Sequence, residues 1–369
     1  MTHDPGLASW LQLTLTPGLG ASAIRNLLRK FGLPGAVLAR SRSELAAHAS
    51  PAALDALYSD AVLESVNRAL QWLAGPERAL VTLADDAYPR ALLEIADPPP
   101  VLYVQGRLGL LQHPSLAIVG SRNATAQGAA NAESFGRALS NAGLTIVSGL
   151  ALGIDAAAHR GGLAGASSTI AVLGTGMDIV YPRRNAELAA EIGARGLLLS
   201  EFPLGTNAAT QNFPRRNRLI SGLSRGCLVV EAALASGSLI TARAAAEQGR
   251  EVFAIPGSIH SPLSKGCHAL LKSGAKLVES AEDVLSELSG YRQSGYASTA
   301  APSEPDAAGL LAHMGHDPVD VDSLCSRAGM SPAQVSSELL RLELEGRVTA
   351  LPGGLYQRLE KDRHGKTTE

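Results

Sequence analysis

Short apolar runs recur through the middle of this chain and alternate with alanine-rich amphipathic stretches. The runs lack any alternation of apolar and polar positions, which is the pattern of parallel strands covered on both faces. They lie at residues 116–119, 144–147, 169–173, 196–199, 227–230 and 251–255. Because helical patterns such as 127–141 and 239–248 separate most of them, the sequence predicts an α/β fold with a Rossmann-like, doubly wound, mostly parallel sheet.

Smaller units flank this predicted sheet. A glycine-bearing turn at 16–20, followed by the amphipathic run 23–31, is similar to SAM-like and helix-hairpin-helix modules. Two short strands at 79–83 and 101–104 lead into the main domain. We expect a helical module over 1–75, the sheet domain over 76–288, a linker rich in Ser, Gly, Ala and Pro over 289–308, a winged-helix module over 309–360 and a tail over 361–369.

The expected winged-helix module has two helices, at 321–328 and 332–344, followed by a hairpin. Its second helix carries Glu338 and Glu343 with Arg341 as its only basic residue, which is unfavourable chemistry for a DNA groove. We therefore expect this module to contact protein or to support a dimer.

Composition limits the classes of function. The 369 residues are 46% hydrophobic and carry a net charge of −2, so the chain does not coat DNA by bulk charge. Three widely spaced cysteines, no signal segment and no membrane-spanning run predict a cytoplasmic protein without a membrane partner. Neither a GxGxxG nor a Walker pattern is complete, which argues against NAD binding and ATP hydrolysis, and we expect no cofactor.

Positive charge is concentrated locally. Residues 181–185 read YPRRN and residues 213–217 read FPRRN, and each unit follows a predicted strand. Guanidinium groups bind phosphate and aromatic rings stack on bases, so the two units predict a groove for a nucleic-acid strand at the carboxyl edge of the sheet. We expect both units in loops. The second unit lies in a run without acidic residues, 202–230, whereas the first forms a flanking wall with Tyr181 either buried or exposed.

Two glycine-bearing loops add candidate phosphate sites. Gly120, Ser121 and Arg122 connect the first main strand to its helix, where free backbone N–H groups attract anions. Ser236, Gly237 and Ser238 open a later helix, although ordinary N-capping explains part of that pattern.

Acidic residues at the same edge would suit a hydrolase. Asp155 and His159 are spaced i,i+4, and Glu201 and Glu231 end strands. We favour a structural interpretation, with pairing along the helix for the first two and N–H or arginine pairing for the glutamates. A nucleotide-binding enzyme similar to the phosphoribohydrolases is the alternative function, but its glycine-rich loop would need a glutamate closer than Glu247.

Taken together, these motifs resemble the DNA-processing protein A family, also called DprA or Smf. The matching stretches are AIVGSR at 117–122, SGLALGIDAAAH at 148–159, AVLGTGMDIVYPRRN at 171–185, LSEFP at 199–203, FPRRNRLISGLS at 213–224, EAALASGSLITA at 231–242 and GREVFAIPG at 249–257. The resemblance implies a non-enzymatic, dimeric protein that binds single-stranded DNA, protects it and loads the recombinase RecA during natural transformation.

The motif analysis and the resemblance together select one set of candidate DNA- or phosphate-binding residues. They are Gly120, Ser121, Arg122, Arg183, Arg184, Asn185, Phe213, Arg215, Arg216, Asn217, Arg218, Ser236, Gly237, Ser238 and Lys265. We expect Gly120, Ser121 and Arg122 to anchor the phosphate.

Overall fold

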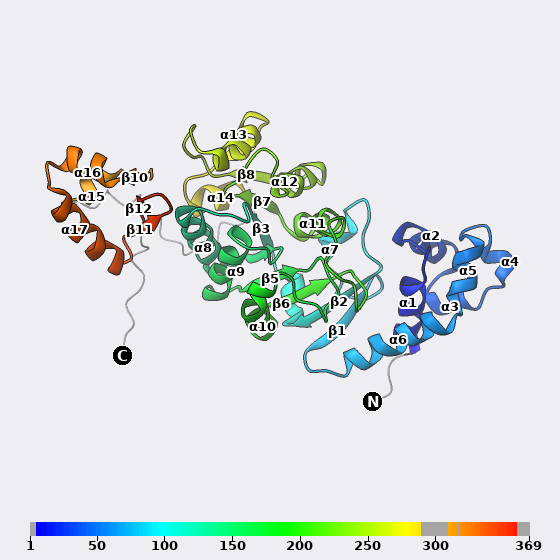
Figure 1. The fold of residues 1–369 in the computed structure, drawn as a ribbon. Helices are drawn as coiled ribbons and strands as arrows, with labels where there is room; N and C mark the ends of the chain where they lie inside the picture. Colours follow the sequence, from blue (N-terminus) through cyan, green and yellow to red (C-terminus); the bar gives the residue numbers. More distant parts are fainter. Residues whose placement is uncertain (1–4, 289–308, 316, 360–369) are drawn as a thin grey trace.

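The computed structural model describes residues 5–288, 309–315 and 317–359, so the expected linker and tail lie outside the described residues. Within them, the largest sheet has nine strands in the order β1-β2-β6-β5-β4-β3-β7-β8-β9 (Figure 1). The strands are β1 Arg78–Thr82, β2 Val101–Gly106, β3 Ser115–Val119, β4 Thr145–Ser148, β5 Thr169–Val172, β6 Leu197–Ser200, β7 Gly226–Val229, β8 Glu251–Ala254 and β9 Lys276–Leu277. From β6 onward in this order, each strand pairs in parallel with the next. At the other end, β1 pairs antiparallel with β2, and β2 pairs antiparallel with β6. The predicted fold class is confirmed.

Helices cover both faces of the sheet because neighbouring residues of each strand point to opposite sides. The helices of this domain are α7 Arg90–Leu93, α8 Ala126–Asn141, α9 Ile154–Ala164, α10 Ala186–Arg195, α11 Asn212–Leu223, α12 Ser238–Glu247, α13 Lys265–Lys272 and α14 Ala281–Glu287. In β3, Ala117 and Val119 pack in the core with α7, α11, α12 and α13, whereas Leu116 and Ile118 pack with α8, α9 and α14. None of the helices in the described part of the chain combines the length and the apolar character needed to cross a membrane.

The strand order reverses at β3. From β3 the chain passes through β4, β5 and β6 on one side, and it returns to β7 on the other side. The loops that leave β3 and β7 therefore run in opposite directions and open a crevice at the carboxyl edge. Such a reversal is the usual ligand position in doubly wound sheets.

The N-terminal module is helical, as expected. Its helices are α1 Pro5–Leu15, α2 Ala21–Phe31, α3 Pro34–Leu38, α4 Arg42–Leu45, α5 Pro51–Leu57 and α6 Asp60–Leu73. Trp10 of α1 and Val66 of α6 share a core with Tyr103 of β2. Arg25 of α2 donates to a carboxylate oxygen of Asp97 at 2.7 Å and to the Pro98 carbonyl at 2.9 Å. Arg25 thus joins this module to the sheet domain.

The C-terminal module is a winged helix, as predicted. Its elements are α15 Leu311–Met314, β10 Val319–Asp320, α16 Val321–Ala328, α17 Pro332–Leu344, β11 Val348–Leu351 and β12 Leu355–Arg358. The strands form a sheet in the order β10-β12-β11. Arg341 of α17 pairs with Glu338 on the same helix and with Glu345, which follows the helix as its C-cap, so the one basic side chain of α17 is neutralised.

Candidate functional site

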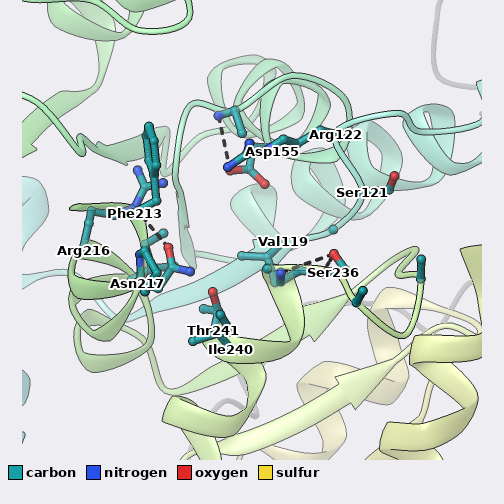
Figure 2. A pocket seen from close by; sticks show the side chains of 18 of the residues that line it. Val119, Ser121, Arg122, Asp155, Phe213, Arg216, Asn217, Ser236, Ile240 and Thr241 are labelled. Carbon is teal, nitrogen blue, oxygen red and sulfur yellow. Dashed lines mark hydrogen bonds between the residues drawn. The ribbon is translucent and has the colours of Figure 1, made fainter. Parts of the chain in front are cut away.

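A pocket of about 630 Å³ lies at the crevice between β3 and β7. The loop after β3 provides Ser121 and Arg122, and α11 provides Phe213, Arg216 and Asn217 (Figure 2). The loop after β7 and the start of α12 complete the wall. Their lining residues include Ala233, Ala235, Ser236, Gly237, Ser238, Ile240 and Thr241. The structure thus brings three separate candidate motifs to one pocket.

The loop after β3 is fixed from two sides. The Ser121 N–H donates to the Glu231 carbonyl at 2.8 Å, and the Ile154 N–H donates to the Ser121 carbonyl at 3.1 Å. A Cβ at Gly120 would lie 2.6 Å from Ile154, and one at Gly153, whose φ is +73°, would lie 2.3 Å from the Ser121 carbonyl. Only glycine permits this close approach.

Arg122 is the exposed charge of this loop. Its guanidinium lies 5.5 Å from the centroid of the Phe213 ring, within the range of a cation–π contact. The ring of Tyr181 lies 5.7 Å from the same Phe213 ring at a tilt of 37°. The sequence left open whether Tyr181 is buried or exposed, and the structure shows its side chain 48% exposed. The aromatic residues of the two repeated units therefore meet beside Arg122.

The second unit is helical, so its expected position in a loop is wrong. Helix α11 begins at Asn212 and includes Phe213 to Asn217. Pro214 stands in the first turn, where the N–H that proline lacks would have no helical partner. The helix directs Arg215 and Arg218 to Glu201, whose Oε2 lies 3.2 Å from Nη2 of Arg215 and 2.5 Å from Nη2 of Arg218. These two arginines do not line the pocket.

Arg216 lines the pocket but is only 5% exposed. Its Nη1 donates to the carbonyls of Gly149, at 2.8 Å, and Val172. Burial lowers the pKa of Arg216 to about 10, which Asp155 opposes, so the guanidinium stays charged at neutral pH. Arg216 was expected to contact phosphate. In this structure its guanidinium is buried and hydrogen-bonded to the backbone at the carboxyl ends of β4 and β5.

The loop after β4 receives bonds from both repeated units. Arg216 binds the Gly149 carbonyl, and the side-chain amide of Asn185 donates to the carbonyls of Leu150, at 2.9 Å, and Ala151, at 3.1 Å. Asn185 is therefore engaged with the backbone and does not line the pocket.

Asp155 and His159 bind the N–H groups of the same loop. Asp155 accepts from Gly149 and Ala151 at 3.1 and 3.3 Å, and His159 Nε2 accepts from Leu150 at 3.2 Å. Burial raises the pKa of Asp155, and Arg216 opposes this rise. Burial lowers the pKa of His159 to about 3, so its ring is neutral at pH 7. These contacts agree with the structural role expected for both residues. The expected pairing of Asp155 with His159 is replaced by hydrogen bonds from each to the backbone.

Of the remaining candidates, Ser236 and Ser238 line the pocket, whereas Arg183, Arg184 and Lys265 do not. Ser236 and Ser238 have their hydroxyl oxygens 2.7 Å apart at the start of α12. Arg183 and Arg184 are exposed in a 3₁₀ turn, Arg183–Asn185, and neither side chain has a hydrogen bond or ion pair within the described residues. Lys265 opens α13, does not line the pocket, and donates to the Ile259 carbonyl.

The two glutamates that a hydrolase could use, Glu201 and Glu231, are both engaged in contacts with other residues. Glu231 accepts from the N–H of Thr125 at 3.0 Å and from its hydroxyl at 2.5 Å, and Glu201 is buried between Arg215 and Arg218. Among the described residues, no group of three or more His, Cys, Asp or Glu side chains is placed to hold a metal.

Sequence reasoning missed the apolar part of the pocket. Ile220, Ile240 and Leu263 line it, as does the hydroxyl-bearing Thr241. Phe213, Asn217 and Ile220 are spaced i, i+4 and i+7 and would have been recognised as one helix face if the second unit had been read as helical.

The motifs at this pocket are those of a known family. The model of the DNA recombination-mediator protein A family matches residues 79–289, and the DprA winged helix domain matches residues 295–354. Protein Smf of Escherichia coli is 45% identical over 314 residues, which cover 83% of this chain and 84% of that protein. The chain belongs to this family. The resemblance inferred from the motifs is confirmed.

Further relatives support the assignment. DNA processing protein DprA of Streptococcus pneumoniae is 52% identical over 206 residues, which cover 56% of this chain and 73% of that protein. Its X-ray structure matches with a TM-score of 0.64 and 40% identity, covering 78% of this chain and 99% of that one. The structure of DNA processing protein A from Helicobacter pylori, which concerns the single-stranded DNA binding mode of that protein, matches with a TM-score of 0.51 and 32% identity. It covers 56% of this chain and 93% of that one.

Proposed function

We propose that this chain binds single-stranded DNA at the pocket between β3 and β7 and acts as a recombination mediator. The observation that carries the proposal is Arg122, an exposed guanidinium on a fixed loop, beside the ring pair of Phe213 and Tyr181. A phosphate bound by Arg122 would place its neighbouring base near these rings. This combination suits a single strand, because its phosphates can bind the guanidinium while its unpaired bases can stack on the rings.

The pocket divides into two chemical parts that match a nucleotide. Gly120, Ser121 and Arg122 form a polar and charged rim together with the start of α12. Phe213, Ile220 and Ile240 form a mostly apolar wall, which suits a base better than a phosphate. The family membership and the DNA binding mode studied for the Helicobacter pylori protein support the same ligand.

The distribution of charge supports binding of single strands that depends mainly on their phosphates and little on their base sequence. Arg216 carries a buried positive charge at the pocket, and the exposed Arg183 and Arg184 follow closely after Tyr181, which lines the same pocket. A single strand neutralised there would release its condensed counterions, so affinity falls as salt rises. Local concentration of arginines explains how a chain with a net charge of −2 binds a polyanion.

Further parts of the proposal concern cellular context. We infer that the protein is cytoplasmic, forms a homodimer, protects incoming single strands and loads RecA during natural transformation. The protein is in this view a binding protein, so incubation with nucleoside monophosphates releases no free base. Measurement of mass in solution tests the dimer, and strand exchange by RecA in the presence of a single-strand-binding protein tests the loading.

Replacement of Arg122 tests the site itself. Arg122→Ala weakens binding of a labelled single strand about tenfold and reduces the slope of log K against log salt by about 0.7, because one phosphate contact is lost. Arg327→Ala, on α16 of the winged helix, serves as a control that removes the same charge elsewhere. Unchanged affinity of Arg122→Ala at low salt would show that the anchor is not here.

A further inference from the structure

Asn217 presents a hydrogen-bond donor to the pocket. It lies one helical turn after Phe213 on α11, so ring and amide occupy the same face of the helix. Both line the pocket, and Figure 2 shows them on the same side of it as Arg216, across from Ser236. A base stacked on Phe213 therefore has its edge close to the amide of Asn217.

The orientation of this amide is determined by Arg216. The Nε–H of Arg216 donates to Oδ1 of Asn217 at 3.2 Å. The guanidinium cannot turn away, because its Nη1 is bound to the Gly149 and Val172 carbonyls and its side chain is buried. A guanidinium only donates, so the atom of Asn217 that faces it must be the oxygen. The nitrogen Nδ2 is left to face the pocket, and the structure gives it no acceptor in the described part of the chain.

A group that only donates distinguishes bases by their pairing edge. Thymine, uracil and guanine carry a carbonyl oxygen at C4 or C6, which accepts from an amide N–H. Cytosine and adenine carry an amino group at that position, which donates and would oppose Nδ2. The side chains of Phe213, Ile220 and Ile240, which line the same pocket, offer no acceptor to such an amino group.

We propose that Asn217 makes the pocket select a base with a carbonyl at C4 of a pyrimidine or C6 of a purine over one with an amino group at that position. The proposal rests on the binding of single-stranded DNA at this pocket. It adds a base preference to a site whose phosphate contacts are independent of sequence. One base is selected within a longer strand, so the preference modulates affinity without restricting the protein to a defined sequence.

Oligo-dU and oligo-dC of equal length provide the test, since the two bases have the same size and differ at the pairing edge. At neutral pH and fixed salt, fluorescence anisotropy is expected to show about fivefold tighter binding of oligo-dU, the contribution of one hydrogen bond. Asn217→Asp retains an oxygen for Arg216 and turns the pocket-facing atom into an acceptor, so it reverses the preference. Asn217→Ala removes the preference.

Asn67→Ala, on an exposed part of α6, is the matched control and retains the preference of the unaltered protein. Equal affinity of the unaltered protein for both strands would overturn the base preference and leave the proposed function intact. A preference that persists in Asn217→Ala would overturn the role of this residue. Failure to bind either strand would instead contradict the proposed function.

Discussion

The units YPRRN and FPRRN have nearly the same sequence and opposite structural roles. In the first, residues 181–185, the two arginines are exposed and the asparagine is buried against backbone. In the second, residues 213–217, the later arginine is buried, the earlier one pairs with Glu201, and the asparagine faces the pocket. The backbone makes the difference, because a 3₁₀ turn and an α-helix direct the same side chains differently.

The two units nevertheless serve one structure. Asn185 of the first and Arg216 of the second bind neighbouring carbonyls of the loop after β4, and their aromatic rings are in contact. A repeat in the sequence thus identified a shared site without indicating which copy provides which group. The corresponding positions, Arg184 with Arg216 and Asn185 with Asn217, offer matched variants.

Arg216→Ala is expected to have the largest effect on folding. It leaves the buried Asp155 without its neighbouring positive charge and removes the donor to the Gly149 and Val172 carbonyls, so the free energy of unfolding falls by about 3–5 kcal/mol. Arg184→Ala, at the matching position of the first unit, changes it by less than about 0.5 kcal/mol because that side chain is exposed. Urea unfolding followed by circular dichroism measures both. Equal losses would mean that the two units are not structurally different.

Asn185→Ala is expected to rank second. It removes two hydrogen bonds to the Leu150 and Ala151 carbonyls and lowers the free energy of unfolding by about 2 kcal/mol. Asn217→Ala, which loses one partly buried bond, costs about 1 kcal/mol or less. The same unfolding experiment compares them, and a larger loss for Asn217→Ala would reverse the assigned roles.

Acid tests the loop to which both units contribute. The pKa of His159 is about 3 in the folded protein against an ordinary value of 6.5, so between these values the unfolded chain binds the additional proton. Stability contributed by the neutral ring is complete above about pH 6.5 and is lost as pH falls towards 3, by up to about 1.4 kcal/mol per pH unit. His159→Gln should flatten the pH dependence of unfolding between pH 6 and 5. An unchanged slope would contradict the burial of a neutral ring.

Replacing the exposed arginines of the first unit should have a smaller effect than the variants above, and only on DNA binding. Arg183→Ala or Arg184→Ala weakens single-strand binding about two- to threefold and lowers the salt slope, without altering the unfolding midpoint. Arg215→Ala, whose guanidinium pairs with Glu201, should change affinity less. Anisotropy titrations at two salt concentrations rank the three variants. If Arg215→Ala were the weakest binder, the second unit would be the outer wall of the groove.

The sheet and the position of the pocket at its carboxyl edge were predictable from the sequence. Unalternating runs such as 116–119 have few other solutions than buried parallel strands, and glycine loops at their carboxyl ends mark the ligand edge. The winged helix followed from the Ser331 N-cap with Pro332 and from the hairpin glycines. These are local signals, which are legible along the chain.

Individual side-chain roles were not predictable in the same way. The second unit was expected in a loop, but its Pro214 is compatible with the first turn of a helix, and the structure is helical there. The burial of Arg216 depends on carbonyls at Gly149 and Val172, which are distant in sequence, and the pairing of Arg215 depends on Glu201. Burial and pairing arise from tertiary contacts, so arginines of identical local sequence acquired different surroundings.

The loop that carries Arg122 is held on one side by the Glu231 carbonyl and on the other by the start of α9, with Gly120 and Gly153 allowing the close approach. Its backbone has therefore lost its conformational freedom during folding, before any ligand arrives. Binding then needs to order only the side chain of Arg122 and the incoming strand. An association of this kind is expected to proceed without a slow conformational step and to retain its speed on strands of any sequence.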